Sequence, residues 1–504
     1  MKRILCIALI FVLVLGAVCL PMTSCGTGEE DVRETSGAGE TEPETVARDE
    51  YGRLLVPSSL PDDLHFSDEE VTILFRDRCS IMETALEFQS PGLASEPVND
   101  AVYTRNKEVE DRLGVTLVYE PIAGEDFNNY LSAVRKTWQA GDGAYDILGY
   151  YAYYGVAMAT EGMMANLLDQ TYIDLDKPWW NQDFTNEMTL FDQLYFAVGD
   201  LSLTATQCTN AIFFNKGMMK DMFAGTDLYA TVQNGDWTLE TFGNMISQCY
   251  FDSNGDGKKD RKDRYGAELT AVSIPMDAYI LSLGCSITEK DEDDVPQISF
   301  GSDHTVDAFN ALFELIIHNE GSLTGPCLYE HYDEAQQKFT DSETLFLLDI
   351  FQATDKLRTM SVDYGVLPMF KYDKAQEGYY TGVSDLFSLL SIFAGTKHGP
   401  AADAVMELMA QKSYEKVTPA YFEISLKQKY SRSNQDAQMF DLTLAGRRFN
   451  FGFVYSNELG NPTHLWRQII ESKANTFSSR LKSVTKTYSK SLQKLVGKYE
   501  KMAG

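Results

Sequence analysis

The sequence predicts an α/β fold in which the strands of a parallel sheet alternate with helices. Short apolar runs rich in β-branched residues alternate with segments whose apolar residues recur every three or four positions. Glycines close two of the helical segments, at Gly114 and Gly141. Alternation with short links is typical of a parallel sheet with helices on both faces, where ligands bind beyond the carboxyl ends of the strands.

The elements follow one another closely in the first part of the chain and are more widely spaced later. The last of them, a basic amphipathic helix, has apolar residues at three and four spacing, which indicates a helix packed on a lobe rather than on a membrane. We expect strands at 71–76, 115–120 and 145–155, and helices at 100–114, 126–141, 237–250, 404–417 and 475–499.

The beginning of the chain has the order of a bacterial secretory signal. Two basic residues precede an apolar run over residues 4–20, which is shorter than the ~20 residues of a membrane-spanning helix. The run ends in MTSC, which resembles a lipobox. We therefore predict a lipoprotein signal peptide at 1–24, lipidation of Cys25, and an extracytoplasmic protein anchored to the cell membrane by this lipid. Secretion without a lipid is the alternative.

The segment at 25–50 is acidic and almost free of apolar residues. Such a segment cannot bury enough surface to offset its ordering entropy, so we expect an acidic flexible tether. The whole chain carries a net charge of −31 at pH 7, which repels phosphate backbones and argues against nucleic acid as a partner. Its length suggests two or more domain-sized units.

Catalytic motifs are missing from the sequence. It contains no GxSxG, HExxH or GxxxxGK[ST], no GxGxxG follows a strand, and its six histidines are scattered. We therefore expect a binding protein rather than an enzyme. A glycoside hydrolase stays open, because its two catalytic acids cannot be found from linear spacing.

Residues 252–263, DSNGDGKKDRKD, have the oxygen spacing of a calcium loop. Position 12 is an aspartate instead of the usual glutamate, and the following segment reads as a strand instead of a second helix. We therefore expect a structural Ca²⁺ site that pins a connection and does not act as a sensor, with a metal-free turn as the alternative. The predicted ligands are Asp252, Asn254, Asp256, the Lys258 carbonyl, Asp260 and Asp263.

Four later stretches together resemble the extracellular solute-binding proteins of ABC importers, the family that includes maltose-binding proteins, and above all its large lipoprotein members. They are AIFFNKGMM at 211–219, WTLETF at 237–242, YGVLPMFKYDKAQEGYYTGVSD at 364–385 and PAYFEISLKQKYSRSNQDAQMFDL at 419–442. The resemblance runs from about residue 66 to the end of the chain.

This resemblance implies a periplasmic-binding-protein-like type II fold, with two discontinuous α/β lobes joined by hinge strands and a ligand cleft between them. The hinge crossings are expected near AIFFNK, near GVLPMF and somewhere around residues 430–445. The first lobe would comprise 51–210 and 371–435, and the second lobe 211–370 and 436–504. Ligand that contacts both lobes favours their closed form, which a membrane permease can recognise.

The resemblance and the residue types together suggest a sugar site of aromatic platforms and polar groups. Trp179 and Trp180 are adjacent, so on an extended segment one would enter the core and the other, Trp180, could stack on ligand. The other candidates lie at the ends of predicted strands, except Asp385, which lies at the start of the strand that returns to the first lobe. Packing or surface ion pairs are the alternative roles. The predicted ligand-binding residues are Arg76, Asp77, Tyr150, Tyr153, Trp180, Asp349, Phe351 and Asp385.

The expected partners are a mono- or oligosaccharide and the permease subunits of an ABC importer, with the protein itself a monomer. An oligopeptide or another metabolite is the main alternative ligand. A surface glycan-binding or sensor protein is the alternative outside transport.

Overall fold

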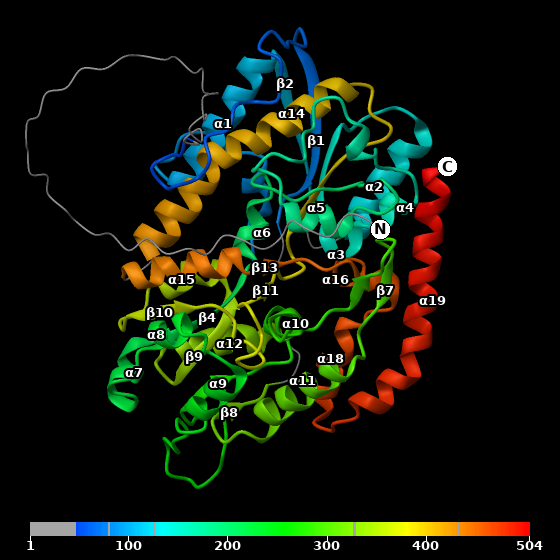
Figure 1. Ribbon diagram of the computed structural model, residues 1–504. Helices are drawn as coiled ribbons and strands as arrows, with labels where there is room; N and C mark the ends of the chain where they lie inside the picture. Colours follow the sequence, from blue (N-terminus) through cyan, green and yellow to red (C-terminus); the bar gives the residue numbers. More distant parts are fainter. Residues whose placement is uncertain (1–46, 79–80, 124–126, 326–328, 431–432) are drawn as a thin grey trace, which may run out of the picture. The chain divides into compact units, whose positions relative to one another are not determined.

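The computed structural model describes residues 47–78, 81–123, 127–325, 329–430 and 433–504 (Figure 1). The predicted signal peptide, Cys25 and nearly all of the predicted tether lie outside the described residues. No helix in these ranges is both long enough and apolar enough to cross a membrane.

The first sheet has the strand order β12-β3-β1-β2. Strands β1 (Glu69–Arg76), β2 (Val115–Ile122) and β3 (Ile147–Tyr151) run parallel, as predicted, whereas β12 (Ser388–Ile392) is antiparallel to β3. Helix α1 (Pro97–Leu113) ends at Gly114, whose φ of 61° lies in the left-handed region that glycine adopts without strain. Helix α1 contacts α14 (Gly399–Lys412), which also contacts β1 and β12.

The second sheet is mixed, which differs from the parallel sheet that the sequence predicts. Its order is β10-β4-β9-β5-β8, and β4 runs antiparallel to both of its neighbours. The bounds are β4 (Asn210–Asn215), β5 (Tyr265–Glu268), β8 (Ser322–Leu323), β9 (Thr344–Ile350) and β10 (Tyr364–Leu367).

The remaining elements surround these two large sheets. We call each of the two large sheets, together with the helices that pack on it, a lobe. The short strands are β6 (Thr288–Lys290), β7 (Pro296–Ile298), β11 (Thr381–Gly382) and β13 (Arg447–Arg448). The helices up to residue 246 are α2 (Phe127–Ala140), α3 (Ala152–Gly155), α4 (Ala157–Thr160), α5 (Gln182–Met188), α6 (Leu203–Gln207), α7 (Lys216–Met222), α8 (Leu228–Gln233) and α9 (Leu239–Ile246). Those that follow are α10 (Ser273–Ser282), α11 (Asp303–Phe313), α12 (Tyr329–Thr340), α13 (Thr354–Leu357), α15 (Asn434–Ala445), α16 (Phe451–Val454), α17 (Ser456–Leu459), α18 (Thr463–Ser472) and α19 (Phe477–Ala503).

Three chain segments lie side by side where the lobes join. The Thr381 hydroxyl donates to Asn210 O over 2.8 Å, and Asn210 Nδ2 donates to Gly382 O over 3.0 Å. Strand β13 runs parallel to β11. The first crossing, at Asn210, lies just before AIFFNK and close to its predicted place. The second crossing, at Thr381 and Gly382, lies well beyond GVLPMF.

The third passage between the lobes, which was expected around residues 430–445, differs from the expectation in its form. It runs from α14 through a π-helix over Pro419–Tyr430, which contacts both α1 and α15. A helix that continues α14 thus makes the connection for which we expected an extended strand.

The C-terminal helix departs from the predicted lobe boundary. Residues 436–504 were expected to belong to the second lobe alone, but α19 contacts α4 of the first lobe as well as α11 and β7 of the second. Its 27 residues make it ~40 Å long, enough to reach both.

The folded part of the chain also begins earlier than the predicted end of the tether at residue 50. Asp49 Oδ1 accepts from the backbone amides of Tyr51 and Arg53 over 2.9 Å each. The Arg53 guanidinium lies 4.6 Å from the ring centroid of Tyr414. These contacts tie residues 48–54 to the first lobe.

Candidate functional site

Charged and aromatic side chains of both lobes meet beyond the carboxyl ends of β1 and β3. We call this group the junction cluster. The first lobe contributes side chains from the ends of β1 and β3, from α3 and from the segment before β12, and the second contributes side chains from α10 and from the start of α18. The junction cluster consists of Arg76, Tyr151, Tyr153, Asp277, Asp385, Asn461, His464 and Arg467.

The first-lobe half of the junction cluster is built around Arg76, the last residue of β1. Its side chain is 3% exposed, and its guanidinium carbon lies 4.7 Å from the ring centroid of Tyr151. Its Nη2 donates to Leu386 O over 2.5 Å. Its Nε and Nη1 have no hydrogen-bond partner among the described residues. Because buried donors are almost always paired, these two groups are well placed for a ligand.

The second-lobe half contains an ion pair. Arg467 Nε lies 3.0 Å from Asp277 Oδ1, without the alignment of a hydrogen bond. Burial raises the pKa of Asp277 to about 7, and the negative charge of Asp385 adds to this rise, while the charge of Arg467 opposes it. Asp277 is 4% exposed. A carboxyl group in this state can either accept or donate a hydrogen bond near neutral pH.

The pKa of the neighbouring histidine moves in the other direction. Burial lowers the pKa of His464 to about 4, and the positive charge of Arg467 adds to this effect. His464 is therefore neutral at pH 7 and offers one ring donor and one ring acceptor.

Tyr153 joins the two lobes. Its hydroxyl donates to Asn461 Oδ1 and lies 3.2 Å from His464 Nε2. The rings of Tyr153 and His464 are parallel within 10°, with centroids 6.2 Å apart. Asn461 has a φ of 61°, a conformation that asparagine adopts more readily than most residues, and the turn directs its side chain toward the first lobe.

An aromatic surface continues from Tyr153 along the first lobe. The ring centroid of Tyr154 lies 4.6 Å from that of Tyr153 and 5.0 Å from that of Phe127, on which it stacks. Tyr154 is 39% exposed. Exposed aromatic faces beside polar groups are typical of sites that bind the apolar faces of sugars.

Opposite charges balance in the junction cluster. Burial raises the pKa of Asp385, but Arg467, Arg76 and a hydrogen bond from the Tyr151 hydroxyl oppose the rise. Two guanidinium groups thus face two carboxyl groups. An added anion would meet two carboxylates, whereas a hydroxyl group can donate to a carboxylate and accept from a guanidinium.

The structure brings three of the predicted ligand-binding residues together, namely Arg76, Tyr153 and Asp385. Asp77 follows Arg76, and its backbone amide donates to Ile122 O over 3.0 Å, toward β2. A ligand role for Asp77 stays a prediction.

Tyr150 and Trp180 lie in the core of the first lobe, which argues against their predicted contact with ligand. Tyr150 is fully buried, and its hydroxyl lies 2.8 Å from Ser391 Oγ. Because side chains alternate along a strand, Tyr151 and not Tyr150 faces the junction cluster. Trp179 and Trp180 do not face opposite ways, because they lie in a turn. Their ring nitrogens donate to the same carboxylate, that of Glu407, over 3.0 and 2.8 Å.

Asp349 and Phe351 are likewise buried, in the second lobe. Asp349 accepts from the Tyr332 hydroxyl and, over 2.8 Å, from Gln336 Nε2. The ring of Phe351 packs edge-on against Phe440 with centroids 5.0 Å apart. The buried apolar run over 344–351 continues through these positions, so both side chains point into the lobe and not out of its edge.

Sequence reasoning missed the second-lobe half of the junction cluster. Asp277 is the only charged residue in helix α10, which is almost entirely buried, and a lone acid in a mostly apolar helix is a signal that could have been read. Asn461, His464 and Arg467 have no comparable signal, because only the fold brings the start of α18 to α3.

The predicted calcium loop connects α9 to β5, so the expected order of helix, loop and strand is confirmed. Its carboxylates accept hydrogen bonds from the loop's own amides: Asp252 from Gly255 and Gly257, Asp256 from Lys258, and Asp263 from Ser253 and Asp260. Within the described ranges, no three His, Cys, Asp or Glu side chains lie close enough to share a metal ion. Binding would require these carboxylates to turn toward a common centre.

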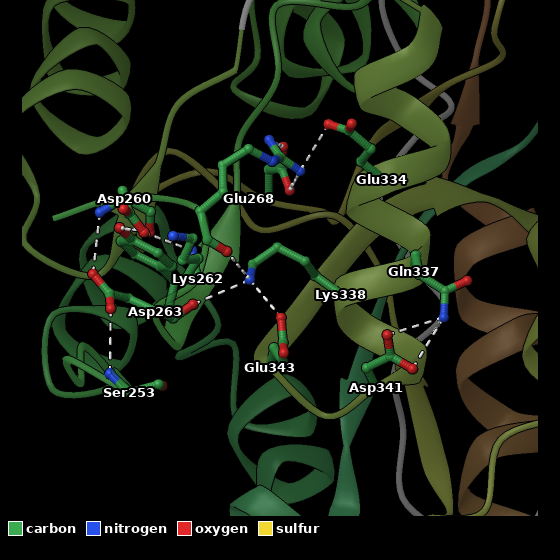
Figure 2. A network of polar contacts seen from close by, with 12 residues as sticks. Ser253, Asp260, Lys262, Asp263, Glu268, Glu334, Gln337, Lys338, Asp341 and Glu343 are labelled. Atoms are coloured by element: carbon green, nitrogen blue, oxygen red, sulfur yellow. Dashed lines mark hydrogen bonds and ion pairs between the residues drawn. The ribbon is translucent and has the colours of Figure 1, made fainter. Parts of the chain in front are cut away.

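An ammonium group holds the returning side of this loop. Figure 2 shows Lys338 of α12 between the loop and Glu343. Its Nζ donates to Arg261 O over 2.7 Å, to Asp263 O over 3.1 Å and to the Glu343 carboxylate over 2.6 Å. The side chain pins the loop to the second lobe from within the protein.

Comparisons with known proteins give structural likeness alone. No protein-family profile matches the chain, and no curated protein matches its sequence. The sugar-binding protein MalE of Xanthomonas citri is 11% identical with a TM-score of 0.60, over 86% of this chain and 99% of that one. An ABC substrate-binding protein of Listeria monocytogenes, solved with cycloalternan, is 13% identical with a TM-score of 0.54, over 84% and 99%.

A third similar structure is the GacH receptor of Streptomyces glaucescens, solved unliganded and with acarbose. It is 15% identical with a TM-score of 0.54, over 84% of this chain and 99% of that one. At these identities the likeness shows the fold. The chain therefore has the periplasmic-binding-protein-like type II fold, in which two discontinuous α/β lobes are joined by hinge strands.

Proposed function

We propose that this protein is the extracytoplasmic substrate-binding lipoprotein of an ABC importer and binds an uncharged mono- or oligosaccharide between its two lobes. The observation that carries the proposal is the junction cluster. There Arg76 presents two buried donors from the first lobe, and Asp277 presents a buried carboxyl from the second. A polyhydroxyl ligand that satisfies both would hold the lobes together.

The aromatic surface beside the junction cluster supports a sugar over a peptide. A short peptide could pair its charged ends with the aspartates and arginines, but it gains little from the partly exposed ring of Tyr154. Structurally similar proteins have been solved in complex with saccharides, one with cycloalternan and another with maltotetraose. The first is named as a substrate-binding protein and the second as a maltodextrin-binding protein, which favours a binding protein over a glycoside hydrolase.

The burial of the junction cluster determines when ligand can enter. Arg76 and Asp277 are both less than 5% exposed, so ligand reaches them only when the lobes separate. Ligand would then favour the closed form by its contacts to both lobes, and the permease subunits would recognise that form. Lipidation of Cys25 would keep a monomeric protein at the membrane face where this exchange occurs.

Isothermal titration with a panel of neutral mono- and oligosaccharides, uronic acids and short peptides tests the proposal. The expected result is binding of a neutral saccharide with one site per chain and recovery of the sugar unchanged. Binding of peptides alone would contradict the sugar assignment. Release of shorter sugars would favour the hydrolase.

We also propose that the loop at 252–263 takes Ca²⁺ as a structural ion. The order of its oxygen-bearing residues and the turn glycine Gly257 support this proposal. Since Lys338 already pins the loop, we expect the ion to add a modest amount of stability.

A further inference from the structure

Helix α19, at one edge of the folded part of the chain, packs on the protein with one face (Figure 1). Successive residues of an α-helix are ~100° apart around its axis, and the buried residues of α19 fall within an arc of about 60°. They are Phe477, Leu481, Tyr488, Leu492, Leu495 and Tyr499. The helix contacts α4 of the first lobe and α11 and β7 of the second. Its apolar face is therefore covered by protein and is not available to a bilayer.

The opposite side of α19 carries a row of lysines. A lysine recurs every fourth residue from 482 to 498, and Lys501 follows almost one turn later. All six of these lysines are exposed. Four of them lie within about 80° of one another, on the side of the helix opposite the buried residues. We call these four the basic face, and they are Lys486, Lys490, Lys494 and Lys501.

The charge of α19 contrasts with that of the whole chain. The helix has seven basic side chains and one acidic side chain, whereas the chain has a net charge of −31. In α1, Lys107 pairs with Glu110 over 2.7 Å. Among the described residues, no carboxylate forms an ion pair with a lysine of the basic face. Because like charges four residues apart destabilise a helix slightly, the repetition of lysine does not serve the fold.

The composition of the basic face favours a lipid surface over an acidic protein as its partner. Protein interfaces are built around buried aromatic and arginine side chains and are poor in lysine. The basic face has lysines, with small exposed polar residues such as Ser483 and Thr487 between them. A lysine is a point charge on a flexible stem, which suits the mobile phosphates of lipid headgroups. Clusters of four or more basic residues on an amphipathic helix are attracted to anionic bilayers in this way.

We propose that the basic face of α19 docks on the anionic phospholipid surface of the membrane. Such a surface repels the negative charge of the rest of the protein, so contact through α19 sets the orientation of the molecule. Because α19 contacts both lobes, a bilayer against its basic face lies beside both of them. This inference rests on the membrane location in the proposed function but not on the identity of the ligand.

Co-sedimentation with lipid vesicles tests the docking. The protein is the chain from residue 25 onward, which contains every described residue, prepared without a lipid. The vesicles are phosphatidylcholine alone or phosphatidylcholine with about one third phosphatidylglycerol. The wild type is expected to bind the anionic vesicles and not the neutral ones. Raising NaCl from about 0.05 M to about 0.5 M should release it, because salt screens the attraction.

Two matched variants, each with four exposed lysines replaced by glutamine, locate the contact. The basic-face variant is expected to bind anionic vesicles at least about tenfold more weakly than the wild type. The control variant loses the same charge elsewhere and should bind like the wild type. Both should keep the Tm of the wild type, because no buried side chain is changed. The basic-face variant combines Lys486→Gln, Lys490→Gln, Lys494→Gln and Lys501→Gln, and the control combines Lys107→Gln, Lys136→Gln, Lys220→Gln and Lys374→Gln.

Three outcomes would overturn the proposal. They are equal binding of the wild type and the basic-face variant, no binding of the wild type to anionic vesicles, and binding to polyglutamate but not to vesicles. The last of these would assign the basic face to an acidic protein. The assay contains neither the lipid at Cys25 nor a sugar, so failure of lipidation or of sugar binding does not affect its result.

Discussion

Arg467 Nε lies 3.0 Å from Asp277 Oδ1, and this ion pair of the second lobe is covered by the first lobe. A buried ion pair is costly to form, since both charges lose their hydration. The charge of Arg467 lowers the pKa of both Asp277 and Asp385, whereas the charge of Asp385 raises that of Asp277, so only part of this cost is offset. Such an arrangement is expected where a polar ligand completes the hydrogen bonding.

The pH dependence of stability should report the burial of Asp277. Its pKa is raised from 3.8 to about 7, so folding favours the protonated form. The resulting stability is full below pH 3.8 and is lost as the pH rises through about 7. Asp277→Asn should therefore show a smaller fall in Tm between pH 5 and pH 8 than the wild type. An identical fall in both proteins would contradict the assignment.

Removal of the Tyr153 hydroxyl should weaken ligand binding without unfolding the protein. Tyr153→Phe keeps the ring but loses the hydrogen bond that joins α3 to Asn461. We expect affinity to fall about tenfold, by the loss of one contact that stabilises the closed form. Tyr172→Phe, in a different part of the first lobe, is the control for titration calorimetry. Equal affinities for both variants would argue against the role of Tyr153.

Trp180 should matter for stability and not for binding. Trp180→Phe removes one of the donors to the buried carboxylate of Glu407, which also accepts from Trp179 and Ser59. The expected cost is about 1–3 kcal/mol of unfolding free energy, measured by denaturant titration. A loss of ligand affinity with unchanged stability would instead restore the stacking role that the sequence suggested.

The secondary structure and the first lobe were largely predictable from the sequence, because local patterns encode them. The strands at 69–76 and 115–122 and the helix that ends at Gly114 follow from apolar periodicity and a glycine stop. The positions of the hinge segments were less predictable. They depend on which strands pair across the chain, as β11 and β13 do.

The candidate site was predictable only in its first-lobe half. Residues that directly follow a parallel strand, such as Arg76, reach the ligand edge by topology alone. The choice between Tyr150 and Tyr151 required the register of β3, which sequence cannot fix to one residue. Arg467 and His464 lie more than 300 residues from Tyr153, and nothing local in α18 marks them as its neighbours.

Calcium should act on stability and leave binding unchanged. Added Ca²⁺ is expected to raise the Tm of the wild type by a few degrees and to leave that of Asp256→Asn unchanged. The loop connects α9 to β5 and is pinned by Lys338 of α12, and none of these elements contributes a side chain to the junction cluster, so chelation should not alter ligand affinity. The same Tm with Ca²⁺ and with chelator would contradict the structural ion.

The central claim is that a neutral saccharide binds between the lobes and favours their closed form. Thermal unfolding of the wild-type protein with and without a panel of neutral saccharides tests it most directly, because a ligand that binds only the folded state raises Tm by mass action. The account predicts a concentration-dependent rise for at least one saccharide, reduced in Arg76→Ala. No rise with any saccharide in the panel would contradict it.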